Sequence, residues 1–116
     1  MTVERSARET VLSFINALNN EDFTQARQYT DSDLLFVGVL GSRHGADAYF
    51  ADMEKMRLKY EVKKVFADGD DVCLWSEIRL SGVAVLTASW YQVKDSRVHS
   101  LKVVFDPRPV LAAKPA

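Results

Sequence analysis

The sequence predicts an α+β domain in which helices come first and cover one face of a curved, mainly antiparallel sheet. Three observations support this fold class. Apolar residues recur at helical spacing in the first half of the chain, and β-branched and aromatic residues fill long runs over 60–105. Short polar turns separate these runs, and tight connections make consecutive strands antiparallel neighbours. The predicted element order is α, α, β, α and then four strands.

The first helix is predicted to begin at Ser6-Ala7-Arg8-Glu9, a capping box in which a hydroxyl and a carboxylate satisfy each other's backbone donors. One apolar stripe then recurs at helical spacing, made by Ala7, Val11, Phe14, Ile15 and Leu18. Asn19-Asn20 ends this helix.

A second, shorter helix is expected over 21–29, because its acidic start suits the positive end of a helix. Residues 31–33, with the sequence Asp-Ser-Asp, predict a turn. The apolar run 34–40 predicts a strand that leads into a loop over 41–45. The connection between the second and third helices is therefore one strand and one loop.

A third helix follows the glycine at position 45. Asp47 in its first turn, and Lys55, Arg57 and Lys59 near its end, match the helix dipole. Its apolar face is predicted to contain Ala46, Tyr49, Phe50, Met53 and Met56.

Four strands are predicted to follow, over 60–67, 71–80, 83–93 and 97–105. The connections between them are Asp68-Gly69, Ser81-Gly82 and Lys94-Asp95-Ser96. In the last strand, alternation places His99, Leu101, Val103 and Phe105 on the drier face.

Length and composition fit one domain over residues 1–116, since 47% of the residues are hydrophobic and 27% are charged. The net charge is −1 and Lys and Arg form no basic stripe, so nucleic-acid binding is not expected. No apolar run is long enough to span a membrane, and the N-terminus lacks the apolar core of a signal peptide. We therefore expect a cytoplasmic protein without membrane contact.

The single cysteine, Cys73, excludes an internal disulfide, and its place within a strand predicts a small buried hydrophobe. The sequence has no His or Cys cluster with metal-ligand spacing, no phosphate-binding glycine loop and no nucleophile elbow. We therefore expect no metal and no cofactor.

Several segments together resemble the nuclear transport factor 2-like superfamily, in its branch of SnoaL-like proteins and ketosteroid isomerase. They are the first helix with its break, residues 11–23, the loop and helix over 41–50, the closing strands, and the tail Phe105-Asp106-Pro107-Arg108-Pro109. The resemblance implies a cystatin-like cone, in which a strongly curved sheet wraps around a long helix and encloses an apolar pocket. It also implies a homodimer that packs through the outer sheet face.

The resemblance does not extend to known catalytic residues. Ketosteroid isomerase uses a tyrosine on the first helix, a carboxylate on the first strand and a protonated carboxylic acid on the penultimate strand. The corresponding positions here hold Phe14, Phe36 or a neighbour of it, and Ser89. Limonene epoxide hydrolases need an Asp-Arg-Asp arrangement, and the nearest match is Glu77-x-Arg79. This spacing also fits an ordinary surface ion pair.

His99 is a further candidate for acid–base chemistry, because a histidine inside the pocket could be a general base. A histidine that is hydrogen-bonded into the core fits the same pattern. Catalytic residues therefore stay open, with His99, Glu77 and Arg79 as weak candidates.

The predicted ligand pocket collects inward-facing side chains of the helices and of the sheet. Most of them are apolar, which is typical of a site for a steroid-, polyketide- or lipid-like molecule that is fixed by one or two hydrogen bonds. Ser89 and His99 are the expected polar contacts. The predicted lining residues are Phe14, Leu18, Phe36, Tyr49, Phe50, Met53, Ser89, His99, Leu101, Val103 and Phe105.

The strand over 83–93 is apolar on both faces, and both faces cannot be covered by the helices. The resemblance places Ser89 inward and Trp90 outward, so we expect a homodimer through the outer face. Three functions remain open. They are binding of a small apolar ligand, isomerase, dehydratase or hydrolase action on such a ligand, and a dimeric protein-interaction module.

Overall fold

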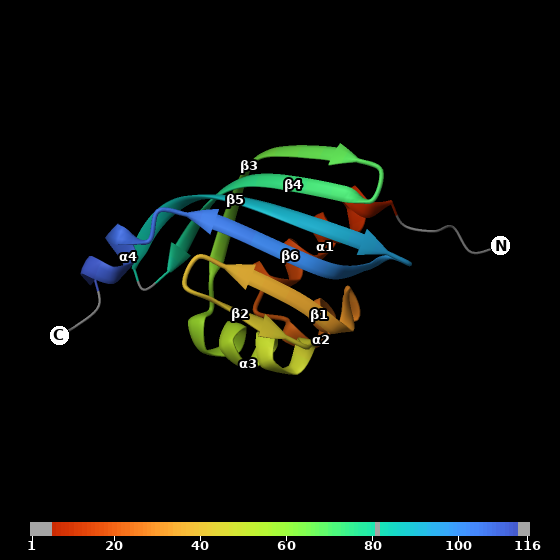
Figure 1. Cartoon of the computed structure of the whole chain (residues 1–116), viewed down its shortest axis with the longest axis horizontal. Coiled ribbons are helices and arrows are strands. Elements are labelled where there is room, and N and C mark those ends of the chain that lie inside the picture. Colours follow the sequence, from red (N-terminus) through yellow and green to blue (C-terminus); the bar gives the residue numbers. More distant parts are fainter. Residues whose placement is uncertain (1–5, 81, 114–116) are drawn as a thin grey trace.

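Six strands form one strongly bent sheet, and helices cover part of its inner face (Figure 1). This computed structural model describes residues 6–80 and 82–113. The helices are α1 (Ala7–Asn19), α2 (Phe23–Gln28), α3 (Ala46–Met56) and α4 (Arg108–Ala113). The strands are β1 (Thr30–Gly38), β2 (Gly41–His44), β3 (Lys59–Asp68), β4 (Asp71–Leu80), β5 (Val83–Lys94) and β6 (Arg97–Phe105). The predicted α+β fold class is confirmed.

The strand order in the sheet is β2-β1-β6-β5-β4-β3. All neighbours are antiparallel except β1 and β6, which run parallel. The turn from β5 to β6 is made by Asp95 and Ser96, both with positive φ, as a tight hairpin requires. Of the predicted break at Ser81-Gly82, Ser81 lies outside the described residues, and Gly82 has a φ of 77°.

The helix α1 begins at the predicted N-cap, Ser6, and half of the predicted capping box is present. The Ser6 hydroxyl accepts a hydrogen bond from the Glu9 backbone N–H at 3.1 Å and donates one to the Glu9 carboxylate, also at 3.1 Å. Val11, Phe14 and Leu18 are buried against β3, β4, β5 and β6. This stripe is therefore the main cover of the sheet's inner face.

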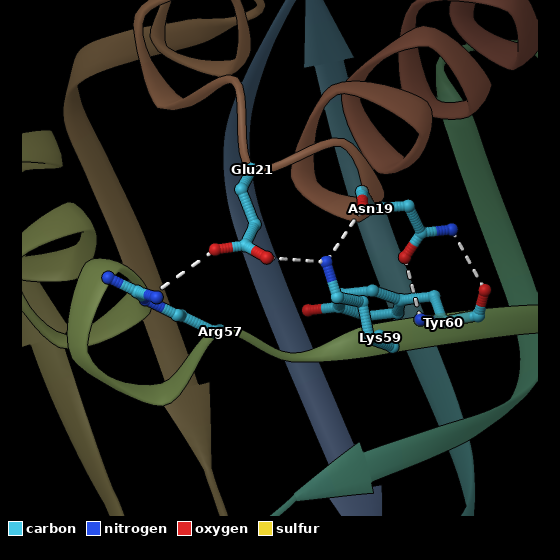
Figure 2. A network of polar contacts seen from close by, with 5 residues as sticks. All are labelled: Asn19, Glu21, Arg57, Lys59 and Tyr60. Atoms are coloured by element: carbon cyan, nitrogen blue, oxygen red, sulfur yellow. Dashed lines mark hydrogen bonds and ion pairs between the residues drawn. The ribbon is translucent and has the colours of Figure 1, made fainter.

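Hydrogen bonds tie the end of α1 to the beginning of β3 (Figure 2). The Asn19 amide donates to the Tyr60 carbonyl at 2.9 Å and accepts from the Tyr60 backbone N–H at 2.7 Å. Lys59 donates to the Asn19 carbonyl and to Glu21, which also lies 3.5 Å from Arg57. The hydrogen bond from Lys59 lowers the pKa of the Glu21 carboxyl. These contacts fix where β3 starts and hence where Tyr60 lies.

The two faces of the sheet differ sharply in burial. Along β5, Val85, Thr87, Ser89 and Tyr91 are buried, whereas Leu86 and Trp90 are exposed. Neighbouring strands continue this alternation, so the inner face is dry and the outer face carries exposed apolar side chains. Cys73 lies on the outer face and is exposed, because its strand neighbours Val72 and Leu74 take the inner positions. The expectation of a buried cysteine is therefore wrong.

Three segments near the ends of elements differ from the sequence predictions. Residues 31–33 belong to β1, although Asp31 Oδ1 accepts the Asp33 N–H at 2.8 Å as in an Asx turn. The expected loop over 41–45 contains the strand β2, since Ser42 and Arg43 pair with β1. The helix α4 was not predicted, and it places Val110 against the sheet near Ile78 and Val85.

The inner face has two halves that we name by their packing. In the closed half, Phe14 of α1 packs against Val72, Leu74 and Val98 of the sheet. All four residues are fully buried or nearly so. The open half contains Ile78, Val85, Val103 and Phe105.

Among the described helices, none is both long enough and apolar enough to cross a membrane.

Candidate functional site

A cavity of about 250 Å³ lies in the open half of the inner face. Its walls are α3, the turn from β1 to β2, the beginning of β3 and the inner side chains of β4, β5 and β6. No described residue of α1 lines it. The cavity therefore begins where the cover provided by α1 ends.

The structure brings seven of the eleven predicted pocket residues together around this cavity. They are Phe36, Tyr49, Met53, Ser89, Leu101, Val103 and Phe105. The lining is mostly apolar, and much of it comes from strands that the sequence placed correctly. It also includes the turn from β1 to β2, which the sequence assigned to a strand end and a loop.

Three other predicted pocket residues, Phe14, Leu18 and Phe50, are buried in the closed half instead. The Phe14 ring lies 6.4 Å from the ring of Phe50 and 6.3 Å from that of Tyr91, both edge to face. Such contacts fill the closed half with aromatic side chains and leave these three residues away from the cavity lining.

His99 does not reach the cavity, because a β-bulge interrupts the alternation that placed it there. Gln92 pairs with Ser100, but its neighbour Val93 pairs with Val98, so β6 holds one extra residue at position 99. Val98 is fully buried in its place. The His99 imidazole is 37% exposed and lies 3.6 Å from the Asp31 carboxylate.

The pair Glu77 and Arg79 lies on the outer face of β4, away from the cavity. Their inner neighbours are Ser76 and Ile78, which are buried. Arg79 is exposed, and its partner in the register of β3 and β4 is Lys59. The spacing in sequence placed both residues on one strand face, but that face is the outer one.

Several residues that line the cavity carry a hydroxyl group, among them Tyr49, Tyr60, Thr87, Ser89 and Tyr91. Burial raises the pKa of all three tyrosines above its ordinary value. These phenols are therefore neutral near pH 7 and can donate hydrogen bonds to an oxygen of a ligand.

The rim of the cavity carries an ion pair that the sequence prediction missed. Arg43 on β2 donates from Nε to Asp52 Oδ2 on α3 at 2.9 Å, and both residues line the cavity. A signal was present in the sequence. Asp52 falls on the same helix face as Tyr49, Met53 and Met56, so a carboxylate interrupts an apolar stripe.

Small residues help to keep this half of the molecule hollow. Thr87 and Ser89 line the cavity from β5 with short side chains. Gly38 lies under the Phe36 ring, and a Cβ atom at position 38 would approach Phe36 Cζ to 2.9 Å. The glycine thus lets the Phe36 ring lie along its own strand at the cavity wall.

Within the described residues, no group of three or more His, Cys, Asp or Glu side chains could hold a metal ion.

Comparison with known proteins identifies the family. The sequence matches the family model of the SnoaL-like domain over residues 11–101, and no curated protein matches it. An NTF2-like protein of unknown function from Cytophaga hutchinsonii has a similar structure, with a TM-score of 0.92 and 40% identity over 96% of this chain and 99% of that one.

Two further solved structures share the fold. A protein from Kribbella flavida has a TM-score of 0.84 and 25% identity, with 93% of each chain covered. An LEH-like epoxide hydrolase from M. tuberculosis has a TM-score of 0.76 and 24% identity over 92% of this chain and 87% of that one, which shows the fold alone. By the family match and its 40% identical structural relative, this chain is a member of the SnoaL-like domain family within the nuclear transport factor 2-like superfamily.

Proposed function

We propose that this protein binds a small, mostly apolar molecule in the cavity between α3 and the open half of the sheet. The observation that carries the proposal is a hollow of about 250 Å³ with mostly apolar walls between α3 and the sheet. Ligand pockets are usually about 300 to 1,000 Å³. Among steroid-, polyketide- and lipid-like molecules, the volume therefore favours compact ones.

Hydroxyl groups are the polar contacts that we propose for this ligand. Ser89 keeps the role expected from the sequence, while the phenols of Tyr49, Tyr60 and Tyr91 take the role that was expected of His99. Because these groups are neutral donors, they suit a carbonyl or hydroxyl oxygen rather than a buried charge.

A thermal-shift screen of compact apolar compounds tests this proposal. A ligand present at 100 times its dissociation constant adds about 2.7 kcal/mol of stability. For a domain of this size the melting temperature should rise by roughly 10 °C. Native mass spectrometry of the freshly purified protein checks for a ligand that it already carries.

Two variants make the screen specific to the cavity. Val103→Trp places an indole inside the cavity and should abolish the shift. Val37→Trp adds the same side chain at an exposed position that does not line the cavity, and it should keep the shift. If no apolar compound raises the melting temperature of the wild type, the binding proposal fails.

An isomerase, dehydratase or hydrolase acting on such a ligand is the second candidate function. The observation that favours it is the Asp52 carboxylate in the cavity wall, since an enzyme of this kind needs an acid or base beside its substrate. His99, Glu77 and Arg79 lie outside the cavity and do not support it. Mass spectrometry of a ligand recovered from the protein separates the two functions. A binding protein returns the compound unchanged, and an enzyme returns it converted.

We further propose that two copies pack through the outer sheet face, as a homodimer or as a dimeric protein-interaction module. Exposed apolar side chains gather there, from Phe66, Trp75, Leu86, Trp90 and Val104. The register brings them close, because Trp75 is opposite Ala88 and Ala88 is opposite Val104. A patch of this kind typically marks an interface.

Light scattering at micromolar concentration tests the dimer. We expect twice the mass of one chain for the wild type and a weaker dimer for Trp90→Lys, which places a charge in the patch. A monomeric wild type would contradict the proposal. The assignments to one domain over 1–116 and to the cytoplasm rest on the sequence alone and stay predictions.

A further inference from the structure

Two charged residues lie at the rim of the cavity, within a lining that is otherwise uncharged. They are Arg43, whose side chain is 53% exposed, and Asp52, whose side chain is 38% exposed. Half exposure places both at the boundary between water and the apolar interior. A ligand in the cavity would therefore have its outer end beside this pair.

The contacts of Arg43 leave one nitrogen of its guanidinium, Nη2, available. Nε donates to Asp52 at 2.9 Å, and Nη1 donates to the Ser42 carbonyl at 3.1 Å. Among the described residues, none accepts a hydrogen bond from Nη2. A guanidinium binds a carboxylate through its N–H groups, and Nη2 still has both of its own available.

We infer that Arg43 binds the carboxylate of an amphipathic ligand whose apolar body fills the cavity. This inference rests on the proposed function and adds the ligand's head group and orientation. Asp52 is a positioning residue in this arrangement, because it holds Nε and so restricts the rotation of the Arg43 side chain at the rim of the cavity.

The interior of the cavity fixes the orientation of such a ligand. Inside are Val103, Phe105 and neutral hydroxyl groups, none of which compensates a negative charge. A carboxylate carried inward would lose its hydration without gaining an ionic partner, which is costly. At the rim it keeps water on one side and meets Arg43 on the other. The head group therefore stays outside and the chain points inward.

The ion pair allows an opposite assignment, in which Asp52 binds an amine. The contacts favour the acid, because the Asp52 carboxylate already accepts from Arg43, whereas Nη2 of Arg43 donates to none of the described residues. Arg43 is also the more exposed of the two. An amine ligand is thus an outcome that the experiment must be able to show.

Isothermal titration calorimetry with decanoic acid, decanol and decylamine at pH 7.5 tests the inference. The three probes share one apolar chain and differ in the charge of the head group. We expect the acid to bind about tenfold or more tightly than the alcohol, since a hydrogen bond to a charged group is worth that ratio. The amine should bind more weakly than the alcohol.

Arg43→Gln should remove the preference for the acid and leave the affinity for decanol unchanged. Arg43→Lys keeps the charge without the fork and should retain part of the preference. Arg27→Gln is the matched control, because Arg27 also pairs with an aspartate of α3, Asp47, but does not line the cavity. It should behave as the wild type.

The outcomes separate this inference from the proposed function. If none of the three probes binds, the inference fails, and the thermal-shift screen decides separately whether the proposed apolar site exists. Three results would contradict the role of Arg43 without contradicting the apolar site. They are equal binding of acid and alcohol, tighter binding of the amine, and an acid preference that survives in Arg43→Gln. Circular dichroism of each variant shows that the fold is intact.

Discussion

The closed and open halves of the sheet's inner face are built from the same strands but packed differently. In the closed half, α1 presses Phe14 and its neighbours against Val72, Leu74 and Val98, and no described cavity-lining residue comes from that helix. In the open half the same sheet face meets α3 across a cavity. The difference arises from where α1 ends, because Asn19 fixes that end to Tyr60 at the border between the halves.

This comparison separates stability from function. Side chains of the closed half touch other side chains on all sides, which maximises dispersion and removes water. Side chains of the open half have one surface without a protein partner, so they contribute less to stability. The protein thus holds its fold with one half and leaves the other available to a ligand.

The largest expected effect comes from removing one aromatic ring from each half. Phe14→Ala should lower the free energy of unfolding by about 3 to 5 kcal/mol, because it opens a cavity in close-packed surroundings. Phe36→Ala enlarges a cavity that already exists and removes a partly buried ring, so we expect a loss of about 1 to 2 kcal/mol. Urea unfolding measures both values.

Equal losses for the two phenylalanine variants would contradict the comparison, since they would mean that both rings are equally well packed. A slope of the urea transition that stays at the wild-type value confirms that the variants unfold from the same compact state. Phe14→Leu is a useful control, because it keeps much of the volume and should cost less than Phe14→Ala.

A smaller effect is expected when a side chain is enlarged on one strand at two positions. Val98 and Val103 both point inward from β6, the first in the closed half and the second at the cavity. Val98→Trp should cost about 1 to 3 kcal/mol by overpacking, whereas Val103→Trp should cost less than about 1 kcal/mol. Thermal unfolding of the two variants side by side gives the difference.

The two tryptophan variants also examine whether the hollow exists in solution. Should Val103→Trp lose as much stability as Val98→Trp, the open half is filled by the protein's own side chains. In that case the ligand proposal loses its support. Fluorescence of the new indole provides a second measurement, since a tryptophan enclosed by apolar walls emits at shorter wavelength than one in water.

Much of the fold was predictable, because local patterns determine it. The N-cap at Ser6, the apolar stripe of α1 and the alternation along β4 and β5 each depend on residues close in sequence. The strand β2 and the helix α4 were missed because tertiary partners create them. Ser42 and Arg43 gain strand structure by pairing with β1, and Val110 gains burial from Ile78 and Val85.

The candidate site was harder to predict than the fold. His99 was misplaced because it is itself the extra residue of a bulge, which breaks the alternation that Leu101, Val103 and Phe105 follow, and neither glycine nor proline marks that bulge in the sequence. Phe14 and Phe50 were assigned to the pocket because apolar character does not distinguish a filled interior from a hollow one. Arg43 and Asp52 meet across two elements, which alternation within one element cannot show.

The central place of β6 in the sheet has a consequence for synthesis on the ribosome. This strand is the last of the sheet to be made, yet it lies between β1 and β5 and pairs with both. Until it emerges, the chain can form only two unconnected pieces of sheet, β1 with β2 and β3 with β4 and β5. Each piece then exposes an unpaired edge. The nascent chain is thus most prone to aggregation just before residues 97–105 emerge, and pairing of β6 closes the cone in one step.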